Sequence, residues 1–229
     1  MPSSYVIEPA PRPALPVMGS DQLFPIRRVY CVGRNYAEHA LEMGGDPKRE
    51  PPFFFQKNPD AFSTAGDFPY PPRTSDVHHE IELVAALAKG GANIPVEGAL
   101  QCVWGYAVAL DMTRRDLQAE AKKLGRPWEV GKAFELAAPS SRLAPAAKIG
   151  HPTKGAIWLD VNGQRRQAGD VSQMIWKIPE IISQLSALFT LGPGDLIMTG
   201  TPAGVGAVKK GDLLRGGVEG VGELEVRVV

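Results

Sequence analysis

The sequence predicts a β-rich α+β fold in which strands outnumber helices. Its 229 residues include 25 glycines and 21 prolines, which are dispersed between short apolar runs and form no low-complexity block. Apolar runs separated by turn-forming residues are typical of many short strands. The length fits one domain of generous size. We therefore expect a single domain over residues 21–229, preceded by an extended arm over residues 1–20, where four prolines lie between Pro9 and Pro16.

The first predicted elements are a strand over residues 26–32 and a short helix over residues 36–43. Asn35, with Glu38 three residues later, has the pattern of a capping box at the start of this helix. The pair Gly44-Gly45 favours the end of the helix, because glycine adopts the left-handed conformation at low cost.

Two apolar runs in the middle of the chain predict strands. Residues 78–87 alternate between polar and apolar types and then become fully apolar, as in a strand that enters a core. Residues 102–110 form a second apolar run, which ends at Asp111. Thr113 and Asp116 then open an amphipathic helix that ends near Gly125.

The remaining elements follow from turn and helix signals. The dipeptide Asn162-Gly163 predicts a tight hairpin between strands over residues 157–161 and 164–167. Pro179, the apolar spacing after it and Gly192 predict a helix. Three further strands are expected over residues 196–199, 212–215 and 223–228.

Composition excludes several classes of function. The 25 lysines and arginines balance 25 aspartates and glutamates, so the basic excess on which nucleic-acid binding depends is missing. The two cysteines, Cys31 and Cys102, lie in apolar runs and offer neither a disulfide framework nor a zinc-ligand pattern. Neither a signal peptide nor an apolar run of membrane-spanning length is evident. We expect a cytoplasmic protein without a nucleic-acid or membrane partner.

Three acidic residues form a candidate metal site. Glu80 and Glu82 lie two apart in an expected strand, so their carboxylates share a face at roughly 6.5 Å. If this face is buried, a proton, a basic partner or a divalent cation must relieve their repulsion. Asp111 ends the next strand behind the small residues Gly105, Ala107 and Ala109, which we expect to leave a hollow. Three carboxylates suit Mg²⁺, Mn²⁺ or Ca²⁺. The alternatives are a solvated strand face and a strand-ending aspartate.

His39 and Glu42 are three residues apart on the short helix and therefore share a face. A carboxylate bonded to one imidazole nitrogen orients the ring and raises its basicity, as a general base acting on water requires. A surface ion pair is the alternative. Lys132 could supply a cation for a substrate carboxylate or oxyanion, or could simply be solvated.

Two other sites are weaker interpretations. Residues 199–206 resemble a phosphate-binding loop but lack its glycine spacing and terminal lysine, although a turn that offers Thr201 and backbone N–H groups to an anion is compatible with them. His78, Glu80 and His151 together have the composition of a 2-His-1-carboxylate iron site. That site would leave Glu82 and Asp111 unexplained.

Several segments together resemble the fumarylacetoacetate hydrolase family, in order and over nearly the whole chain. They are residues 31–36 with His39 and Glu42, residues 79–83, residues 111–113, residues 128–134, and residues 194–195 with 199–206. The resemblance implies a mixed β-sandwich or roll with few helices, a homodimer, and a divalent cation, Mg²⁺ or Mn²⁺.

Position by position, the resemblance implies a role for each site residue. Glu80, Glu82 and Asp111 match the metal ligands, and His39 with Glu42 matches the pair that activates water. The implied substrate contacts are Lys132, Thr201, Arg115, Gln118 and Lys57. For Lys57 the position stays open, because Asn58 separates it from Pro59 where many members have a Lys-Pro pair.

The resemblance extends to acylpyruvases and, in the segment Phe55-Gln56-Lys57-Asn58-Pro59, to fumarylpyruvate hydrolases of gentisate breakdown. It therefore implies a hydrolase that uses activated water to cleave a carbon–carbon bond of a 2,4-dioxo acid, for example fumarylpyruvate, to give fumarate and pyruvate. The alternatives are a decarboxylase or isomerase of oxaloacetate-like or homoprotocatechuate-pathway dioxo acids, and a catalytically silent metal-binding protein.

Overall fold

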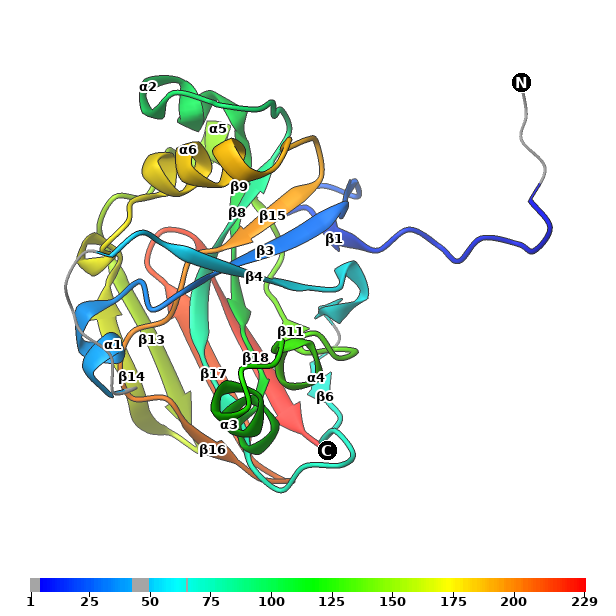
Figure 1. Cartoon of the computed structure of the whole chain (residues 1–229), viewed down its shortest axis with the longest axis vertical. Coiled ribbons are helices and arrows are strands. Elements are labelled where there is room, and N and C mark those ends of the chain that lie inside the picture. The colour runs from blue at the N-terminus through cyan, green and yellow to red at the C-terminus, as the bar shows by residue number, and fades with distance from the viewer. Residues whose placement is uncertain (1–4, 43–49, 65) are drawn as a thin grey trace.

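Two large β-sheets form the centre of the molecule. In this computed structural model, residues 5–42, 50–64 and 66–229 are described (Figure 1). The larger sheet has six strands in the order β12 (Ala144–Pro145), β9 (Val103–Leu110), β8 (Ile81–Leu87), β15 (Asp195–Met198), β3 (Arg28–Gly33) and β4 (Phe53–Lys57). The second has five, in the order β14 (Gln164–Asp170), β13 (Ala156–Val161), β17 (Leu213–Val218), β18 (Gly222–Val228) and β6 (Asp67–Phe68).

Three small sheets complete the strand framework. They are β10 (Thr113–Arg114), β7 (Val77–His79) and β16 (Gly206–Val208); β1 (Ala14–Pro16) with β2 (Leu23–Pro25); and β11 (Ala138–Pro139) with β5 (Phe62–Ser63). The α-helices are short: α1 (Ala37–Glu42), α2 (Val96–Ala99), α3 (Arg115–Lys123), α4 (Glu129–Lys132), α5 (Ala146–Ile149) and α6 (Ile178–Leu188). Single 3₁₀ turns occur at η1 (Pro59–Ala61), η2 (Leu100–Cys102) and η3 (Val171–Gln173). The fold is therefore a strand-rich α+β fold with few helices, as the sequence predicts.

The core lies between the two large sheets. Strands β8 and β9 of the first pack against β13, β17 and β18 of the second. All seven residues of β8 are buried, which explains the unbroken apolar run in its sequence. Helix α6 covers one end of the assembly together with α2 and α5 (Figure 1), and it buries Ile181, Ile182 and Leu185.

The strand expected over residues 78–87 is interrupted at Glu80. The part before it, β7, pairs with β10 and β16, whereas the part after it, β8, pairs with β9 and β15. The expectation of one continuous strand is therefore wrong. The chain passes from a small sheet to a large one at this point, and Glu80 is the residue at the junction.

Two local predictions have opposite outcomes. The hairpin at Asn162-Gly163 is confirmed, with φ angles of 52° and 76° that match a type I′ turn. The predicted capping box at Asn35 is wrong, because the Asn35 amide is used over long range. Its Nδ2 donates to the carbonyls of Thr199 (2.8 Å) and Trp176 (2.9 Å), and its Oδ1 accepts from the Trp176 N–H. The Gly44-Gly45 pair lies outside the described residues.

The N-terminal segment extends away from the sheets before it joins them (Figure 1). Residues 5–12 are exposed, but β1 pairs with β2, and Leu15 and Val17 belong to the core. Packing therefore begins ahead of residue 21, the boundary expected from the sequence, because apolar side chains alternate with the prolines there. Within the described residues, no helix combines the length and the apolar character needed to cross a membrane.

Candidate active site

Glu80, Glu82 and Asp111 converge at one end of the β8–β9 pair. In this antiparallel pair Ile81 lies opposite Leu110, so the residue before β8 and the residue after β9 are neighbours. The Asp111 N–H donates to the Glu80 carbonyl at 2.7 Å and fixes this relationship. Each side chain offers one carboxylate oxygen, and these oxygens all lie within 4.8 Å of one another. All three residues are buried.

The hollow expected beneath Asp111 does not arise from Gly105. A Cβ added at Gly105 would lie 2.4 Å from the carbonyl oxygen of Ala144, because β12 pairs closely with β9 there. The glycine therefore serves sheet packing.

Three cations neutralise the carboxylates from the protein side. Lys132 Nζ lies 2.8 Å from Glu80 Oε2 and 2.7 Å from Asp111 Oδ2. Lys57 Nζ lies 2.8 Å from the other oxygen of Asp111, and Arg115 Nη2 lies 2.5 Å from Glu80 Oε1. Burying three acids without such partners would be prohibitively unfavourable.

These charges divide the triad into two kinds of acid. Burial raises the pKa of Glu80, but the positive charges of Lys132 and Arg115 outweigh it and bring this pKa well below its usual value. Burial raises the pKa of Glu82 well above its usual value, and the negative charges of Asp111 and Glu80 add to the effect. Burial lowers the pKa of Lys132, yet Asp111 and Glu80 outweigh it and raise this pKa. Of the three acids, Glu82 is thus the one whose negative charge is least offset by nearby cations.

A tight turn after β15 holds Glu82. The Gly200 N–H donates to Glu82 Oε2 at 2.8 Å. Gly200 has φ of 96°, and a Cβ there would lie 2.7 Å from the Cβ of Asn35. Only glycine meets both demands. Because Asn35 also binds the Thr199 carbonyl, the two loops are tied together beside the triad.

The donor set fits a hard divalent cation. The triad supplies buried carboxylate oxygens, the ligands preferred by Mg²⁺ and Mn²⁺, and it is able to bind such an ion. Among the described residues this is the cluster with metal-ligand geometry, and it contains no histidine. The iron alternative is therefore wrong: His78 Nε2 bonds Asp76 Oδ1 at 2.9 Å, and His151 Nδ1 bonds the Tyr106 hydroxyl at 2.6 Å.

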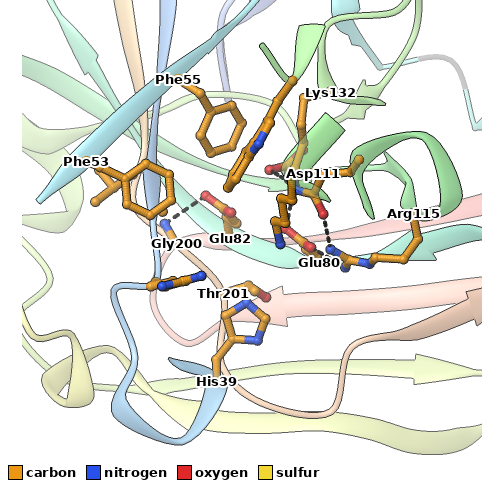
Figure 2. Close-up of a pocket in the computed structure, with 16 residues that line it drawn as sticks. His39, Phe53, Phe55, Glu80, Glu82, Asp111, Arg115, Lys132, Gly200 and Thr201 are labelled. Atoms are coloured by element: carbon orange, nitrogen blue, oxygen red, sulfur yellow. Dashed lines mark hydrogen bonds and ion pairs between the residues drawn. The ribbon is translucent and has the colours of Figure 1, made fainter. Parts of the chain in front are cut away.

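His39 and Glu42 meet on one face of α1. His39 Nδ1 lies 3.1 Å from Glu42 Oε2. An ionised carboxylate only accepts, so Nδ1 carries the hydrogen and Nε2 is left free in the neutral ring. The Gly204 N–H donates to both oxygens of Glu42, at 3.1 and 3.2 Å. The His39 ring points toward the carboxylates beside Thr201 (Figure 2). This is the geometry of a general base whose ring is held by a second residue.

The loop over residues 199–206 binds acidic side chains of the protein itself. Its N–H groups at Gly200 and Gly204 donate to Glu82 and Glu42 respectively. The sequence is compatible with a bound anion at the N–H groups of this loop. Two of these N–H groups instead donate to carboxylates of the protein itself.

Gln167 orients the hydroxyl of Thr201, and sequence reasoning missed it. It is fully buried, and its Nε2 donates to Thr201 Oγ1 and to the Pro202 carbonyl, both at 2.8 Å. Its Oε1 accepts from His79 Nδ1 (2.9 Å) and from the Ile81 N–H (3.1 Å). Because Thr201 Oγ1 already accepts a hydrogen bond, its own hydrogen remains for a ligand in the pocket.

The remaining predicted contacts separate into two groups. Arg115 and Gln118 line the pocket, where Arg115 Nη1 donates to Gln118 Oε1 at 2.7 Å and leaves the amide hydrogens of Gln118 available for a ligand oxygen. Lys57 lies behind the triad. Its ammonium contacts Asp111, the Lys132 carbonyl at 2.5 Å and the Met112 carbonyl at 3.2 Å. Lys57 therefore supports Asp111 and is not among the residues that line the cavity.

The pocket has an aromatic wall that sequence analysis did not identify. The pocket is lined by the triad, His39, Thr201, Lys132 and a group of aromatic side chains. These are Phe53, Phe55 and Trp128. The Trp128 ring centroid lies 5.4 Å from that of Phe53 and 5.7 Å from that of Phe55. The alternation of β4 offered a signal, because Phe53 and Phe55 share one face of that strand.

Known proteins are similar to this chain in fold and in sequence. A family model described as "Fumarylacetoacetate (FAA) hydrolase C-terminal" matches residues 28–229. The crystal structure of fumarylpyruvate hydrolase from Pseudomonas aeruginosa in complex with Mn²⁺ and pyruvate is 55% identical, has a TM-score of 0.97 and is matched over 99% of each chain. The mitochondrial oxaloacetate tautomerase of Rattus norvegicus is 43% identical over 202 residues, 88% of this chain and 91% of the relative. The mitochondrial oxaloacetate decarboxylase of Dictyostelium discoideum is 42% identical over 197 residues, 85% and 90% respectively.

Proposed function

The chain belongs to the fumarylacetoacetate hydrolase family, and from this premise we propose that it hydrolyses a carbon–carbon bond of an acylpyruvate, with fumarylpyruvate as the favoured substrate. The observation that carries the proposal is the placement of His39, held by Glu42, in the same cavity as three convergent carboxylates. The likeness to a fumarylpyruvate hydrolase at 55% identity supports the choice of substrate.

Binding of a 2,4-dioxo acid requires groups that recognise oxygen atoms. A bound Mg²⁺ or Mn²⁺ supplies Lewis-acid stabilisation for the negative charge that develops on the 2-oxo acid. Glu80, Glu82 and Asp111 would hold the ion. Thr201 and Gln118 each have a hydrogen to donate, and Lys132 presents its ammonium beside the same cavity. These donors position the substrate next to His39.

His39 then activates water. Its Nε2 accepts a proton from a water molecule while Glu42 holds the opposite nitrogen. The oxygen of that water forms a bond to C4 of the substrate. The Gly204 N–H keeps Glu42 in place as the ring becomes charged. Positioning of this kind replaces a bimolecular encounter by reaction within one complex.

Cleavage follows from the tetrahedral centre at C4. The C3–C4 bond breaks, its electron pair stays with the three-carbon part, and the proton that His39 took from water is delivered to C3 to give pyruvate. The acyl part leaves as a carboxylic acid, which is fumarate for fumarylpyruvate. Lys132, which is held in its charged form by Glu80 and Asp111, stabilises negative charge in the cavity.

A second candidate function is tautomerisation or decarboxylation of oxaloacetate or a related dioxo acid. It is favoured by the relatives at 42–43% identity that carry these activities in their names. Tautomerisation requires only proton transfer, whereas decarboxylation releases CO₂. A third candidate, a silent metal-binding protein, would need no ordered His39.

Product analysis separates these functions. The purified protein with Mn²⁺ or Mg²⁺ is supplied with fumarylpyruvate, acetylpyruvate and oxaloacetate, and products are followed by NMR. We expect pyruvate and one further acid in equal amounts from an acylpyruvate. Release of CO₂ or enol–keto conversion of oxaloacetate, without cleavage of either acylpyruvate, would favour the second function. No turnover of any substrate would favour the third.

The family resemblance also leads us to propose a homodimer, a place in gentisate breakdown and a cytoplasmic location. Cys31 and Cys102 are both free and buried, which agrees with a reducing compartment. Sedimentation of the purified protein tests the dimer, and a monomer at micromolar concentration would contradict it.

A further inference from the structure

Two cations that line the pocket take no part in the neutralisation of the triad. Arg34 and Lys122 lie along the same cavity as the carboxylates. Arg115 and Lys132 are paired with those acids. Across residues 5–42, 50–64 and 66–229, no carboxylate forms an ion pair with Arg34 or Lys122. Their positive charge is therefore available to a ligand.

Lys122 is held at the pocket although its surroundings oppose its charge. It extends from α3, and its Nζ lies 4.9 Å from the centroid of the Trp128 ring. Burial lowers its pKa to about 8, and the positive charges of Arg115 and Arg34 contribute. An anion placed between these cations would relieve that cost.

Arg34 is positioned by a strained loop. Its φ is 56°, in the left-handed region that non-glycine residues rarely adopt. Asn35 next to it is fixed by bonds to Thr199 and Trp176. On the other side, the Phe53 ring lies directly over Gly33, where an added Cβ would meet it at 2.0 Å. The Arg34 guanidinium lies 6.0 Å from the centroid of that ring.

Aromatic side chains lie beside both the triad and the two cations. Phe55 is near the triad, because the Nζ of Lys132 is 5.1 Å from its ring centroid. Phe53 lies next to Arg34, and Trp128 lies next to Lys122. Trp128 contacts both phenylalanines, so the wall is continuous. An apolar wall of aromatic rings suits the hydrocarbon part of an unsaturated chain.

We propose that Arg34 and Lys122 form a subsite for a carboxylate at the far end of the acyl group, so that the enzyme selects acylpyruvates whose acyl arm ends in an anion. This inference rests on the proposed function and deepens it. The 2-oxo acid end of the substrate lies at the triad, the unsaturated carbons lie along Phe55 and Trp128, and the terminal carboxylate reaches the two cations. Arginine recognises a carboxylate through paired donors, and lysine adds a point charge.

The kinetic test compares fumarylpyruvate with the analogue that carries a crotonyl group. The two have the same carbon chain and double bond and differ in the terminal carboxylate, which is a methyl group in the analogue. We expect the wild type to prefer fumarylpyruvate by roughly a hundredfold in kcat/KM, and Lys122→Gln and Arg34→Gln each to reduce this ratio by about tenfold. Lys123→Gln, at an exposed position next to Lys122, is the matched control and should keep the ratio.

A binding measurement provides a readout that is independent of turnover. Calorimetry with fumarate and crotonate, with and without Mn²⁺, should give tighter binding of fumarate in the wild type. This preference should fall in both variants and persist in Lys123→Gln.

The outcomes separate the subsite from the reaction. If acylpyruvates are cleaved but the fumaryl-to-crotonyl ratio is the same in the wild type and both variants, the subsite is wrong and the hydrolase assignment stands. If neither acylpyruvate is cleaved, the proposed function fails, and a fumarate preference that depends on Arg34 and Lys122 would still support the anion subsite. Equal binding of fumarate and crotonate by the wild type would overturn it.

Discussion

Lys132 holds its ammonium 2.7 Å from Asp111 Oδ2 and 2.8 Å from Glu80 Oε2, on two of the carboxylates that would hold a divalent cation. The lysine and the ion are therefore electrostatic competitors as well as neighbours. Lys132 offsets the charge of two of the three acids. This relationship distinguishes residues that ligate the ion from residues that balance its charge.

Lys132→Met and Asp111→Ala should have opposite effects on metal affinity. Loss of a ligand should weaken Mn²⁺ binding by about a hundredfold or more, whereas loss of the lysine charge should strengthen it. Both should reduce hydrolysis, Lys132→Met by about 10²-fold. Electron paramagnetic resonance of free Mn²⁺ measures the affinities, with Glu225→Gln on the exposed face of β18 as a control. Weaker Mn²⁺ binding in Lys132→Met would contradict the charge-balancing role.

His39→Ala should lower the rate of hydrolysis by roughly 10²- to 10⁴-fold while Mn²⁺ binding persists. The ring has no part in the acid cluster, and general-base catalysis contributes roughly 10² to 10⁴ in rate. Glu42→Gln should lower the rate less, because the amide still bonds Nδ1. Turnover is compared with the bound Mn²⁺ content of each variant. Unchanged hydrolysis in His39→Ala would remove the assignment of the base.

Mn²⁺ binding should release a proton at every pH below the raised pKa of Glu82. The pKa of Glu82 is raised above its ordinary value of 4.5 by burial and by Asp111 and Glu80, so the metal-free protein retains this proton over a range above that value. Affinity should therefore rise with pH until Glu82 is ionised. Calorimetry in buffers of different ionisation enthalpy counts the protons released. Absence of proton release at every pH would show that Glu82 is already ionised.

The same shift predicts how metal-free stability depends on pH. A group whose pKa is higher in the folded state contributes stability below its unfolded pKa and loses it as the pH rises through the folded value. Glu82 should thus reduce stability as the pH rises above about 4.5, and bound Mn²⁺ should reduce that loss. Glu80 has the opposite shift, so Glu82→Gln is needed to isolate the contribution. Thermal unfolding with and without Mn²⁺ measures it.

Gln167→Leu should impair both stability and substrate binding. It leaves the Ile81 N–H, His79 and Thr201 without their partner, at a cost of about 1–3 kcal/mol for each buried polar group left unpaired. In a double-mutant cycle with Thr201→Val, the effects on KM should be less than additive, because Gln167 acts on substrate through that hydroxyl. Fully additive effects on KM would show that Gln167 does not act on the substrate through the Thr201 hydroxyl.

Gly200→Ala should destabilise the protein more than Gly220→Ala. Both glycines have positive φ, 96° and 74°, but an added Cβ meets Asn35 at 2.7 Å only at Gly200 and meets nothing within 4 Å at Gly220. The control should lose about 1 kcal/mol from backbone strain alone, and Gly200→Ala about 1–3 kcal/mol more from the contact. Denaturant unfolding measures the difference. Equal losses of stability in the two variants would mean that the loops of Gly200 and Asn35 can move apart at no cost in free energy.

Local spacing predicted the parts of the site that depend on neighbouring residues. Glu80 and Glu82 share a face because residues two apart do so in extended chain, and His39 meets Glu42 because residues three apart do so in a helix. Asp111 joins them because β8 and β9 are antiparallel neighbours. The sequence pointed to Asp111 by a different signal, the small residues that precede it. The predicted β-rich α+β class is confirmed, because it too was inferred from local patterns of apolar and turn-forming residues.

Long-range partners explain what could not be predicted. Gln167 lies within β14, where nothing in its surroundings distinguishes it, and its contacts to His79 and Thr201 span 88 and 34 positions. The Asn35 amide bonds groups 141 and 164 positions away, so the local capping pattern was misleading. Lys57 reaches Asp111 from the edge strand β4. Such pairings depend on how the sheets pack.

The position of β15 in the larger sheet has a consequence for synthesis on the ribosome. This strand lies between β8 and β3, parallel to the latter, although Asp195–Met198 follows β3 by more than 160 positions. While the nascent chain is shorter, β3 and β8 each present an unpaired edge, and edges of that kind invite intermolecular association. Strand β15 therefore closes the sheet late in synthesis, and C-terminal truncations that remove it should aggregate.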